Sequence, residues 1–447
     1  MTNEKYGLIG KTLVHSYSKE IHEALGRYQY QLFSLAEDEM PDFINARDFR
    51  GLNVTIPYKK DVIPLCDEVT DLARGIGAVN TLFWKNASGT GASESINQEE
   101  KILVGHNTDY EGFLYAASRA GIDFEGKGVL ILGTGGTSLM ARRAAADQNA
   151  AKIYIASRHP ETDPPSGSEI QDAGILSTVS YDQLPEIADS IDVIVNTTPV
   201  GTFPNNMQQV IRLKDFPGCQ AVIDVIYNPF KTALLLEAEK LGLKYTNGLP
   251  MLVAQATAAA GYFLGTPGAF QKENQRIIKA MKQQMGNIVL IGMPGTGKSL
   301  IGKLLAELTG KTLQDTDAKI EEEAKMTIPE IFEKEGESGF RDRESAICKK
   351  LGKERNLIIA TGGGAILRPE NVDALRQNGT LVHITRSIDK LPTRGRPLSK
   401  SIETLKKMEA QRMPLYKAAA DITFRNNYTC SRKKLRQRVT TYILEKL

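Results

Sequence analysis

The sequence predicts an α/β protein that holds two nucleotide-binding units. Short apolar runs alternate with longer amphipathic stretches from residue 7 onward, as expected of strands and helices in turn. Two of these runs, 129–132 and 288–291, are each followed by a glycine-rich loop and then by residues with helical spacing. The chain has 447 residues, more than one hydrophobic core usually organises, so two or more compact units are expected.

Each glycine-rich loop belongs to a longer run of predicted elements. The polar stretch 271–284 indicates a connecting helix between the two units, because it has few large apolar side chains. After it the pattern restarts with the strand 288–291 and a helix over 299–309. In the first unit the expected elements are strands over 7–10, 31–35, 129–132 and 152–156, and helices over 19–28 and 138–149.

Composition favours small-molecule chemistry. Lysine and arginine number 56 against 53 acidic residues, so the formal charge of +3 gives no reason to expect nucleic acid or a membrane surface as a partner. No run of about 18 apolar residues occurs, and the first residues lack the pattern of a secretory leader, so a cytoplasmic location is expected. The four cysteines form no metal-type cluster, and the sequence leaves the oligomeric state open.

The second glycine-rich loop is the more specific of the two. Gly292-Met-Pro-Gly-Thr-Gly-Lys298-Ser299 matches GxxxxGK[ST] between a predicted strand and a helix, the arrangement of a P-loop. Lys298 is expected to reach the β- and γ-phosphates of ATP, and the Ser299 hydroxyl to bind Mg²⁺. The predicted ATP contacts are Gly295, Thr296, Gly297, Lys298, Ser299 and Leu300.

The first glycine-rich loop, which runs from Gly133 to Thr137, departs from the GxGxxG pattern of dinucleotide folds. The next predicted strand ends in Ser157-Arg158, where an NAD-binding fold usually has an acidic residue. A guanidinium can bind a 2′-phosphate, so the sequence favours NADP; a solvated surface arginine is the alternative. The predicted NADP contacts are Gly133, Thr134, Gly135, Gly136, Thr137, Ser157, Arg158 and Gly248.

Further blocks suit a small polyhydroxylated carboxylate. They are His15-Ser16-Tyr-Ser18, Gly51-Leu-Asn53-Val-Thr55-Ile-Pro57-Tyr-Lys59, Gly77-Ala-Val-Asn80-Thr81, Asn107-Thr-Asp109, Asp224-Val-Ile-Tyr227-Asn-Pro229 and Gly248-Leu-Pro-Met251-Leu-Val-Ala-Gln255. With these blocks, residues 5–265 resemble the shikimate dehydrogenase family. The resemblance implies a two-lobed α/β dehydrogenase with a Rossmann-type NADP lobe. It also implies substrate contacts from Ser16, Ser18, Asn53, Thr55, Lys59, Asn80, Asp109, Tyr227 and Gln255.

Reduction of a ketone needs a hydride and a proton, and Lys59 with Asp109 is the expected acid/base pair by this resemblance. The alternative interpretation makes Lys59 a surface ammonium and Asp109 a helix cap.

The C-terminal blocks resemble the shikimate kinase family over 287 to about 427. They are Asp315-Thr-Asp317, Gly336-Glu-Ser-Gly-Phe-Arg341-Asp-Arg-Glu344, Gly362-Gly-Gly364, Arg396-Pro-Leu398 and Arg412-Met-Pro-Leu-Tyr416. The resemblance implies a parallel-sheet P-loop kinase similar to the nucleoside monophosphate kinases, with Lys298 and Asp317 as catalytic residues. Asp317, Arg341, Gly363 and Arg412 are the expected shikimate contacts, and Ser299 with Asp315 the Mg²⁺ ligands. Arg394, in a lid over 388–400, is expected to contact ATP and to act in catalysis.

Together the resemblances imply NADPH-dependent reduction of 3-dehydroshikimate to shikimate, followed by MgATP-dependent phosphorylation of shikimate. The predicted domains are 1–265 (a substrate lobe of 1–112 and 236–265, an NADP lobe of 113–235), a helical linker 266–286 and a kinase 287–447. Two alternatives remain open. One is a quinate/shikimate dehydrogenase with NAD preference fused to a small-molecule kinase, and the other makes one half a non-catalytic regulatory module.

Overall fold

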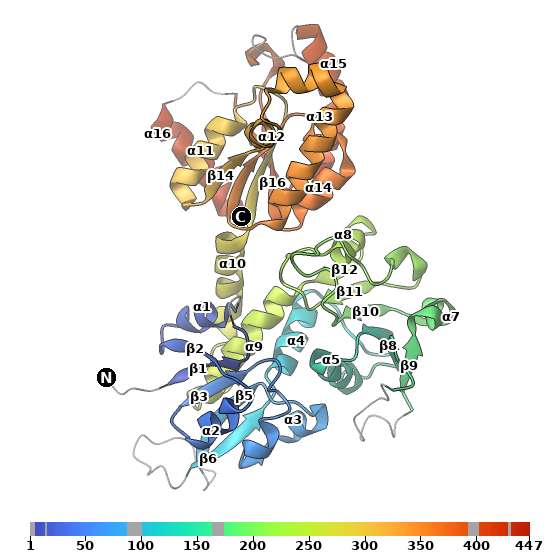
Figure 1. Ribbon diagram of the computed structural model, residues 1–447, viewed down its shortest axis with the longest axis vertical. Helices are drawn as coiled ribbons and strands as arrows, with labels where there is room; N and C mark the ends of the chain where they lie inside the picture. Colours follow the sequence, from blue (N-terminus) through green and yellow to red (C-terminus); the bar gives the residue numbers. More distant parts are fainter. Residues whose placement is uncertain (1–4, 14–15, 87–100, 163–173, 392–401, 428–430) are drawn as a thin grey trace. The chain divides into compact units, whose positions relative to one another are not determined.

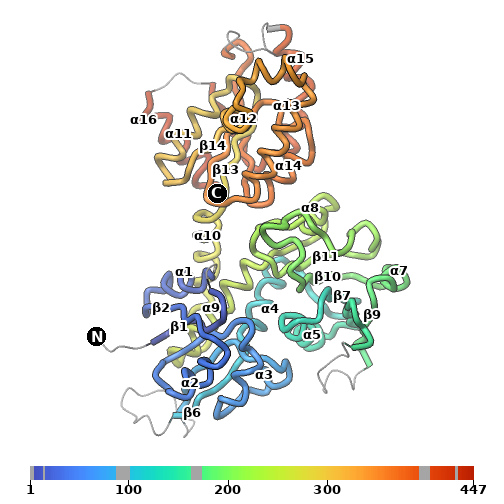
Figure 2. Tube along the Cα trace, viewed as in Figure 1, coloured from blue at the N-terminus to red at the C-terminus, as the bar shows by residue number. Residues whose placement is uncertain are grey.

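The computed structural model describes residues 5–13, 16–86, 101–162, 174–391, 402–427 and 431–447, coloured along the chain in Figures 1 and 2. The chain divides into two compact units, which are described separately. The first comprises Met1–Thr202 and Gln208–Lys279, and the second Phe203–Met207 and Ala280–Leu447. The predicted linker, 266–286, spans the position near residue 279 where the chain passes from one unit to the other.

The first unit begins with a six-stranded mixed sheet in the order β2-β1-β3-β5-β6-β4. β5 runs antiparallel to both β3 and β6, and the buried residues Ile9, Leu52 and Leu82 form part of its core. The elements are β1 (Tyr6–Gly10), α1 (Ser18–Glu23), β2 (Tyr30–Ser34), α2 (Glu39–Asn45), β3 (Gly51–Val54), β4 (Glu68–Val69), α3 (Asp71–Ile76), β5 (Thr81–Asn86) and β6 (Lys101–His106).

The helix predicted over 19–28 ends earlier, at Glu23. Gly26 has a φ of 65°, a left-handed conformation that stops an α-helix and that glycine adopts without strain. The chain then turns, so that the Tyr28 ring stacks on Tyr6 in β1 with 4.2 Å between ring centroids. Gly26, which the predicted helix included, therefore lies in the turn that follows the helix.

The second sheet has the order β12-β11-β10-β7-β8-β9, and every pairing in it is parallel. In chain order this is 6-5-4-1-2-3, the strand order of a dinucleotide-binding fold, with the switch point between β7 and β10. The elements are α4 (Asp109–Arg119), β7 (Gly128–Leu132), α5 (Gly136–Asp147), β8 (Lys152–Ser157), β9 (Leu176–Ser180), α7 (Leu184–Ile187), β10 (Val193–Asn196), β11 (Ala221–Asp224), α8 (Ala233–Lys240), β12 (Lys244–Thr246) and α9 (Gly248–Phe263).

The boundary drawn at residue 236 between the predicted lobes does not match this sheet. β12 pairs with β11, and Leu234, Leu235 and Ala238 of α8 pack in the core of the same lobe. Residues 236–246 therefore lie in the nucleotide lobe. α4 and α9 lie between the two sheets and pack against one another (Figure 1). At their contact a methyl group placed on Gly112 would lie 2.6 Å from the Met251 carbonyl oxygen, so glycine permits the close approach.

The second unit has a five-stranded, fully parallel sheet in the order β14-β15-β13-β16-β17. α11 and α16 cover one face, and α13, α14 and α15 the other (Figure 1). α10 (Asn274–Met285) begins in the first unit and ends in the second. The further elements are β13 (Asn287–Ile291), α11 (Lys298–Thr309), β14 (Thr312–Asp315), α12 (Thr316–Ala324), α13 (Ile328–Lys353, kinked at Gly336), β15 (Leu357–Ala360), α14 (Pro369–Arg376), β16 (Gly379–Thr385), α15 (Ile402–Ala419), β17 (Ile422–Arg425) and α16 (Arg432–Tyr442).

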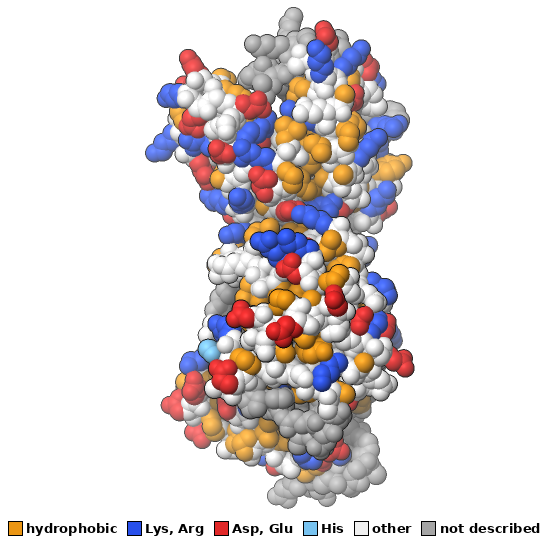
Figure 3. Space-filling model, turned by 90° about the vertical axis from the view of Figure 1, so that its right-hand side faces the viewer, with side chains coloured by type: hydrophobic (Ala, Val, Ile, Leu, Met, Phe, Trp, Pro, Cys, Tyr) orange, Lys and Arg blue, Asp and Glu red, His pale blue; other side chains and the backbone are white. Residues whose placement is uncertain are grey.

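The surface carries charges of both signs. On the face drawn in Figure 3, Lys and Arg side chains are interspersed with Asp and Glu. Among the described helices, none combines the length and the apolar character that crossing a bilayer requires.

Candidate active sites

A cavity of about 370 Å³ opens in the first unit. Its walls come from residues far apart in sequence: the chain after β1, the end of β3, the start of α4, the loop after β11 and α9. The structure brings together in this cavity all of the predicted substrate contacts, namely Ser16, Ser18, Asn53, Thr55, Lys59, Asn80, Asp109, Tyr227 and Gln255.

The predicted acid/base pair is formed inside this cavity. Lys59 Nζ donates to Asp109 Oδ2 at 2.6 Å, and the two side chains are only 20% and 15% exposed. Asp109 is the first residue of α4, whose cap residue is Thr108, and its carboxylate is turned toward Lys59. Neither a surface ammonium nor a helix cap describes these two groups.

Two asparagines support the cavity wall through a buried network. Asn80 Oδ1 accepts from the Thr108 backbone N–H at 2.7 Å, which fixes the chain directly before Asp109. Asn53 Oδ1 accepts from the Tyr30 hydroxyl at 2.7 Å, and Asn53 Nδ2 donates to Asn80 O and Thr81 Oγ1, both at 3.2 Å. The Asn53 amide is thus largely occupied within the protein.

The glycine-rich loop of the first unit connects β7 to the N-terminus of α5. Gly133 has a φ of 97°, and a methyl group placed on it would lie 3.0 Å from Thr198 Cγ2. At Gly135 and Gly136 such a methyl group would meet nothing within 4 Å, so the backbone there is open to a ligand. Thr137, in the first turn of α5, also lines the substrate cavity. Open backbone N–H groups at the start of a helix suit the pyrophosphate of a dinucleotide.

Ser157 and Arg158 lie at the end of β8, next to β7. Ser157 is buried, and its Oγ accepts from the His159 backbone N–H at 2.9 Å, so it shapes the turn after the strand. Arg158 directly follows β8 and is exposed. Gly248, the remaining predicted cofactor contact, begins α9 and lines the substrate cavity.

Sequence reasoning missed the polar residues at the end of β10 and directly after it. Thr197 Oγ1 donates to the Leu132 carbonyl at 2.7 Å, and Asn196 Oδ1 accepts from Thr198 Oγ1 at 2.7 Å. β10 pairs with β7, so these side chains stand beside the glycine-rich loop at the switch point. The run Asn-Thr-Thr, which begins with the last residue of a buried strand, was the available signal.

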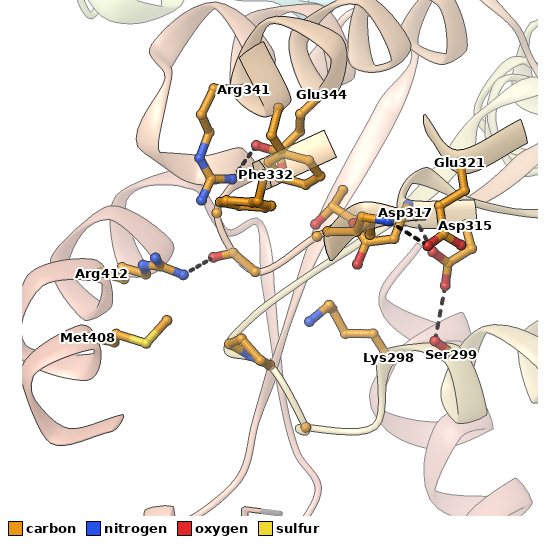
Figure 4. Close-up of a pocket in the computed structure, with 18 of the residues that line it drawn as sticks. Lys298, Ser299, Asp315, Asp317, Glu321, Phe332, Arg341, Glu344, Met408 and Arg412 are labelled. Carbon is orange, nitrogen blue, oxygen red and sulfur yellow. Dashed lines mark hydrogen bonds and ion pairs between the residues drawn. The ribbon is translucent and has the colours of Figure 1, made fainter. Parts of the chain in front are cut away.

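The second unit has its own cavity, of about 590 Å³, drawn in Figure 4. Most of the predicted kinase residues line it: Gly295, Gly297, Lys298, Ser299, Leu300, Asp315, Asp317, Arg341, Gly363 and Arg412. Thr296 is the exception, because it is buried and its hydroxyl donates to the Met293 carbonyl at 2.9 Å. Arg394, the predicted lid arginine, lies outside the described residues.

The P-loop has the geometry that its glycines permit. Gly295 and Gly297 have φ angles of 86° and 96°, which favour glycine. Lys298 Nζ donates to the carbonyls of Gly292 and Met293 at 2.7 and 3.1 Å, which holds the ammonium over the loop. Ser299 Oγ lies 3.1 Å from Asp315 Oδ2, so a hydroxyl and a carboxylate, both oxygen ligands that Mg²⁺ accepts, meet at the loop (Figure 4).

Asp317 and Glu344 face one another across the glycine segment after β15. A methyl group placed on Gly362 would lie 2.7 Å from both Asp317 Oδ1 and Glu344 Oε1. Both oxygens are buried and have no hydrogen-bond partner among the described residues. Burial, reinforced by Asp315 and Glu344, raises the pKa of Asp317 to about 6. Asp317 therefore lines the cavity and has one buried carboxylate oxygen without a hydrogen-bond partner among the described residues.

The two arginines that are predicted to contact shikimate make hydrogen bonds within the protein. Arg341 Nη1 donates to Glu344 at 2.6 Å, and the Glu344 side chain is completely buried. Arg412 Nη1 and the Tyr416 hydroxyl both donate to the Gly363 carbonyl, at 2.9 and 2.6 Å. Sequence reasoning assigned no role to Glu344, although its spacing of three residues from Arg341 on one helix was a usable signal.

Comparison with known proteins decides the family. The family models described as shikimate dehydrogenase substrate binding domain and as shikimate kinase match residues 8–82 and 294–447. The chain is 35% identical over 268 residues to a shikimate dehydrogenase (NADP(+)) of Caldicellulosiruptor bescii, covering 57% of this chain and 88% of that protein. It is 46% identical over 145 residues to a shikimate kinase of Nitrosomonas europaea, covering 31% of this chain and 69% of that protein. The chain belongs to both families.

The dehydrogenase part also resembles solved structures. A chorismate mutase/shikimate 5-dehydrogenase fusion protein from Clostridium acetobutylicum superimposes with a TM-score of 0.54 at 31% identity, covering 63% of this chain and 98% of that chain. The fold class and the family resemblances predicted from sequence are confirmed. The protein is a bifunctional shikimate-pathway enzyme that combines a shikimate dehydrogenase with a shikimate kinase.

Proposed function

We propose that the dehydrogenase reduces 3-dehydroshikimate with NADPH and that the kinase then phosphorylates the shikimate formed, using MgATP. The observation that carries the first step is the Lys59–Asp109 pair, 2.6 Å apart in a cavity that Thr137 of the glycine-rich loop also lines. The product of the reduction is the substrate of the kinase, so the chemistry fixes the order of the two reactions.

In the reduction, NADPH supplies the hydride. Lys59 lies in the cavity as a proton donor for the oxygen of the reduced ketone. Asp109 accepts the hydrogen bond of Lys59, which holds the ammonium in the cavity. Hydroxyl and amide groups of Ser16, Asn80 and Gln255 orient the ring.

The preference for NADP over NAD is assigned to Arg158. Its exposed guanidinium at the end of β8 can pair with a 2′-phosphate, and no carboxylate occupies the end of that strand. This argues against a quinate/shikimate dehydrogenase with NAD preference.

In the kinase, ATP bound with Mg²⁺ supplies the phosphoryl group. The P-loop suits the phosphates, with Lys298 as the cationic contact, and Ser299 with Asp315 would hold the ion. Within the described ranges no cluster of three or more His, Cys, Asp or Glu side chains is arranged to hold a metal, which fits an ion that arrives with the nucleotide and keeps several waters. Asp317 accepts the proton of the attacking hydroxyl, while Arg341 and Arg412 bind the substrate carboxylate.

The test follows both products from 3-dehydroshikimate, NADPH and MgATP. Wild-type protein should oxidise the cofactor and form shikimate 3-phosphate. Lys59→Ala should phosphorylate only added shikimate, and Lys298→Ala should accumulate shikimate. The neighbouring exposed lysines provide matched controls, and Lys60→Ala and Lys303→Ala should retain both activities. A wild type that carries out neither step would contradict both substrate assignments.

A further inference from the structure

A buried carboxylate at the end of β11 connects the segments that form the dehydrogenase site. Asp224 is completely buried. Its Oδ1 accepts from Asn196 Nδ2 and from the Ile226 backbone N–H, both at 3.1 Å, and its Oδ2 accepts from Thr232 Oγ1 at 2.6 Å. Burial raises the pKa of Asp224 to about 6, and these three donors oppose the rise, so the group is a carboxylate at neutral pH.

The first of these bonds leads to the cofactor loop. A carboxylate only accepts, so Asp224 forces Asn196 to turn its Nδ2 inward and its Oδ1 outward. Asn196 Oδ1 then accepts from the backbone N–H and the hydroxyl of Thr198, at 3.1 and 2.7 Å. Thr198 in turn packs beside Gly133, where a methyl group placed on the glycine would lie 3.0 Å from its Cγ2. The orientation of one amide thereby positions the wall of the NADP loop.

The second bond leads to the substrate cavity. The Ile226 N–H is held by Asp224, and the Ile226 carbonyl accepts from the Gly248 N–H at 2.9 Å. Gly248 fits tightly there, since a methyl group on it would lie 1.9 Å from the Val225 carbonyl oxygen. Val225, Tyr227 and Gly248 all line the cavity. The same carboxylate thus fixes the segment that presents Tyr227 and the first turn of α9.

The third bond anchors the carboxylate itself. Thr232 caps α8, because its hydroxyl oxygen accepts from the Leu235 N–H at 3.4 Å while it donates to Asp224. The Thr232 side chain is buried, so this contact is protected from water.

We propose that Asp224 is a positioning residue that couples the NADP loop to the substrate cavity through Asn196 and Ile226, without touching either ligand. This inference rests on the proposed NADPH-dependent reduction. The proposal predicts that loss of the Asp224 carboxylate weakens the binding of both ligands. The hydrogen bond to Asn196 supports the cofactor loop, and the hydrogen bond to Ile226 supports the wall of the substrate cavity.

The experiment uses the full chain, whose kinase activity reports on the amount of intact protein. Asp224→Ala is compared with Asp224→Asn, which keeps an oxygen for Asn196 and Ile226. Asp192→Ala is the matched control: Asp192 accepts from the Gly128 N–H at 2.9 Å and from Gln220 Nε2 at 3.0 Å, and it directly precedes β10, at the opposite end of the strands from Asp224. The measurements are the Kd of NADP⁺ by calorimetry, the KM for the ketone substrate, kcat, and urea unfolding.

For Asp224→Ala we expect the Kd of NADP⁺ and the KM for the ketone substrate each to rise about tenfold, with kcat/KM lower by up to about 100-fold. Asp224→Asn should recover most of this loss. Asp192→Ala should lower the unfolding midpoint and leave Kd and KM at wild-type values. Equal effects of Asp192→Ala and Asp224→Ala, or an unchanged Kd and KM with only less active enzyme, would overturn the proposal.

Asn196→Ala decides the matter if the Asp224→Ala dehydrogenase does not fold. This variant breaks only the cofactor branch, so the Kd of NADP⁺ should rise while the KM for the ketone substrate stays near wild type. An unchanged Kd would refute the coupling. Failure of the proposed function would look different, because the wild-type protein itself would then not turn over 3-dehydroshikimate.

Discussion

Asp317→Asn is expected to make the kinase unit more stable while it abolishes phosphoryl transfer. In the folded protein the pKa of Asp317 is raised from 3.8 to about 6, chiefly by burial and then by Asp315 and Glu344. A difference of about two pH units corresponds to about 3 kcal/mol of unfolding free energy. Asparagine has nearly the same shape as the neutral acid and carries no charge, so it removes this cost.

The pH dependence of this stabilisation follows from the direction of the pKa shift of Asp317. The pKa of Asp317 is higher in the folded protein than in the unfolded chain. Its contribution to the unfolding free energy is therefore largest below pH 3.8, where the group is protonated in both states, and is lost as the pH rises to about 6. The stability of wild type and variant should therefore be equal at the acid end, and the variant should be about 3 kcal/mol more stable above pH 6.

The assay is urea unfolding of the full chain at several pH values, followed by hydrogen exchange in peptides from α12 and β15, with phosphoryl transfer measured in parallel. Peptides from the dehydrogenase β7 serve as the internal control and should not change. A variant that is less stable than wild type at pH 7.5, or a stability difference that does not depend on pH, would refute the reasoning about Asp317.

Three further predictions concern activity. Kinase kcat/KM should fall about tenfold for each pH unit below 6 as Asp317 is protonated, as measured from initial rates; a flat profile down to pH 5 would exclude Asp317 as the base. Gly362→Ala should lower kinase kcat/KM about 100-fold and leave the dehydrogenase activity unchanged, because the new methyl group would lie 2.7 Å from Asp317 Oδ1 and Glu344 Oε1. Wild-type kinetics in this variant would show that the backbone around Gly362 shifts to accept the methyl group. Arg158→Glu should raise the KM for NADPH roughly 10- to 100-fold and change that for NADH little; equal changes for both cofactors would disprove the assignment.

The sequence was most informative where one short segment carries the whole signal. The P-loop from Gly292 to Ser299 could be predicted because its glycines, lysine and serine act within one strand–loop–helix unit. The paired Lys59 and Asp109 are 50 residues apart, and only the family resemblance brought them together. The distance between Lys59 Nζ and the Asp109 carboxylate, and the burial of both side chains, could be learned only from the structure.

Other features left too little local pattern. β12 is three residues long, too short for a periodicity, so the lobe boundary at 236 was misplaced. Glu344 and Asp224 make their hydrogen bonds to residues on another helical turn or on another strand. In the sequence, neither can be distinguished from an ordinary acidic residue. Such hydrogen bonds form only when the helices and strands pack together, so no short stretch of the sequence predicts them.

The close contact between α4 and α9 has a consequence for how the dehydrogenase could evolve or be engineered. Asp109 begins α4 and Gln255 lies on α9, and both contribute to the cavity wall. Between them Gly112 rests against the Met251 carbonyl and the Gln255 Cβ, where a methyl group would lie 2.6 and 2.9 Å away. Cavity width here is therefore set by a backbone-to-backbone spacing. A larger residue at position 112 would push α4 and α9 apart, and would thereby move Asp109 and Gln255 without replacing any residue that lines the cavity.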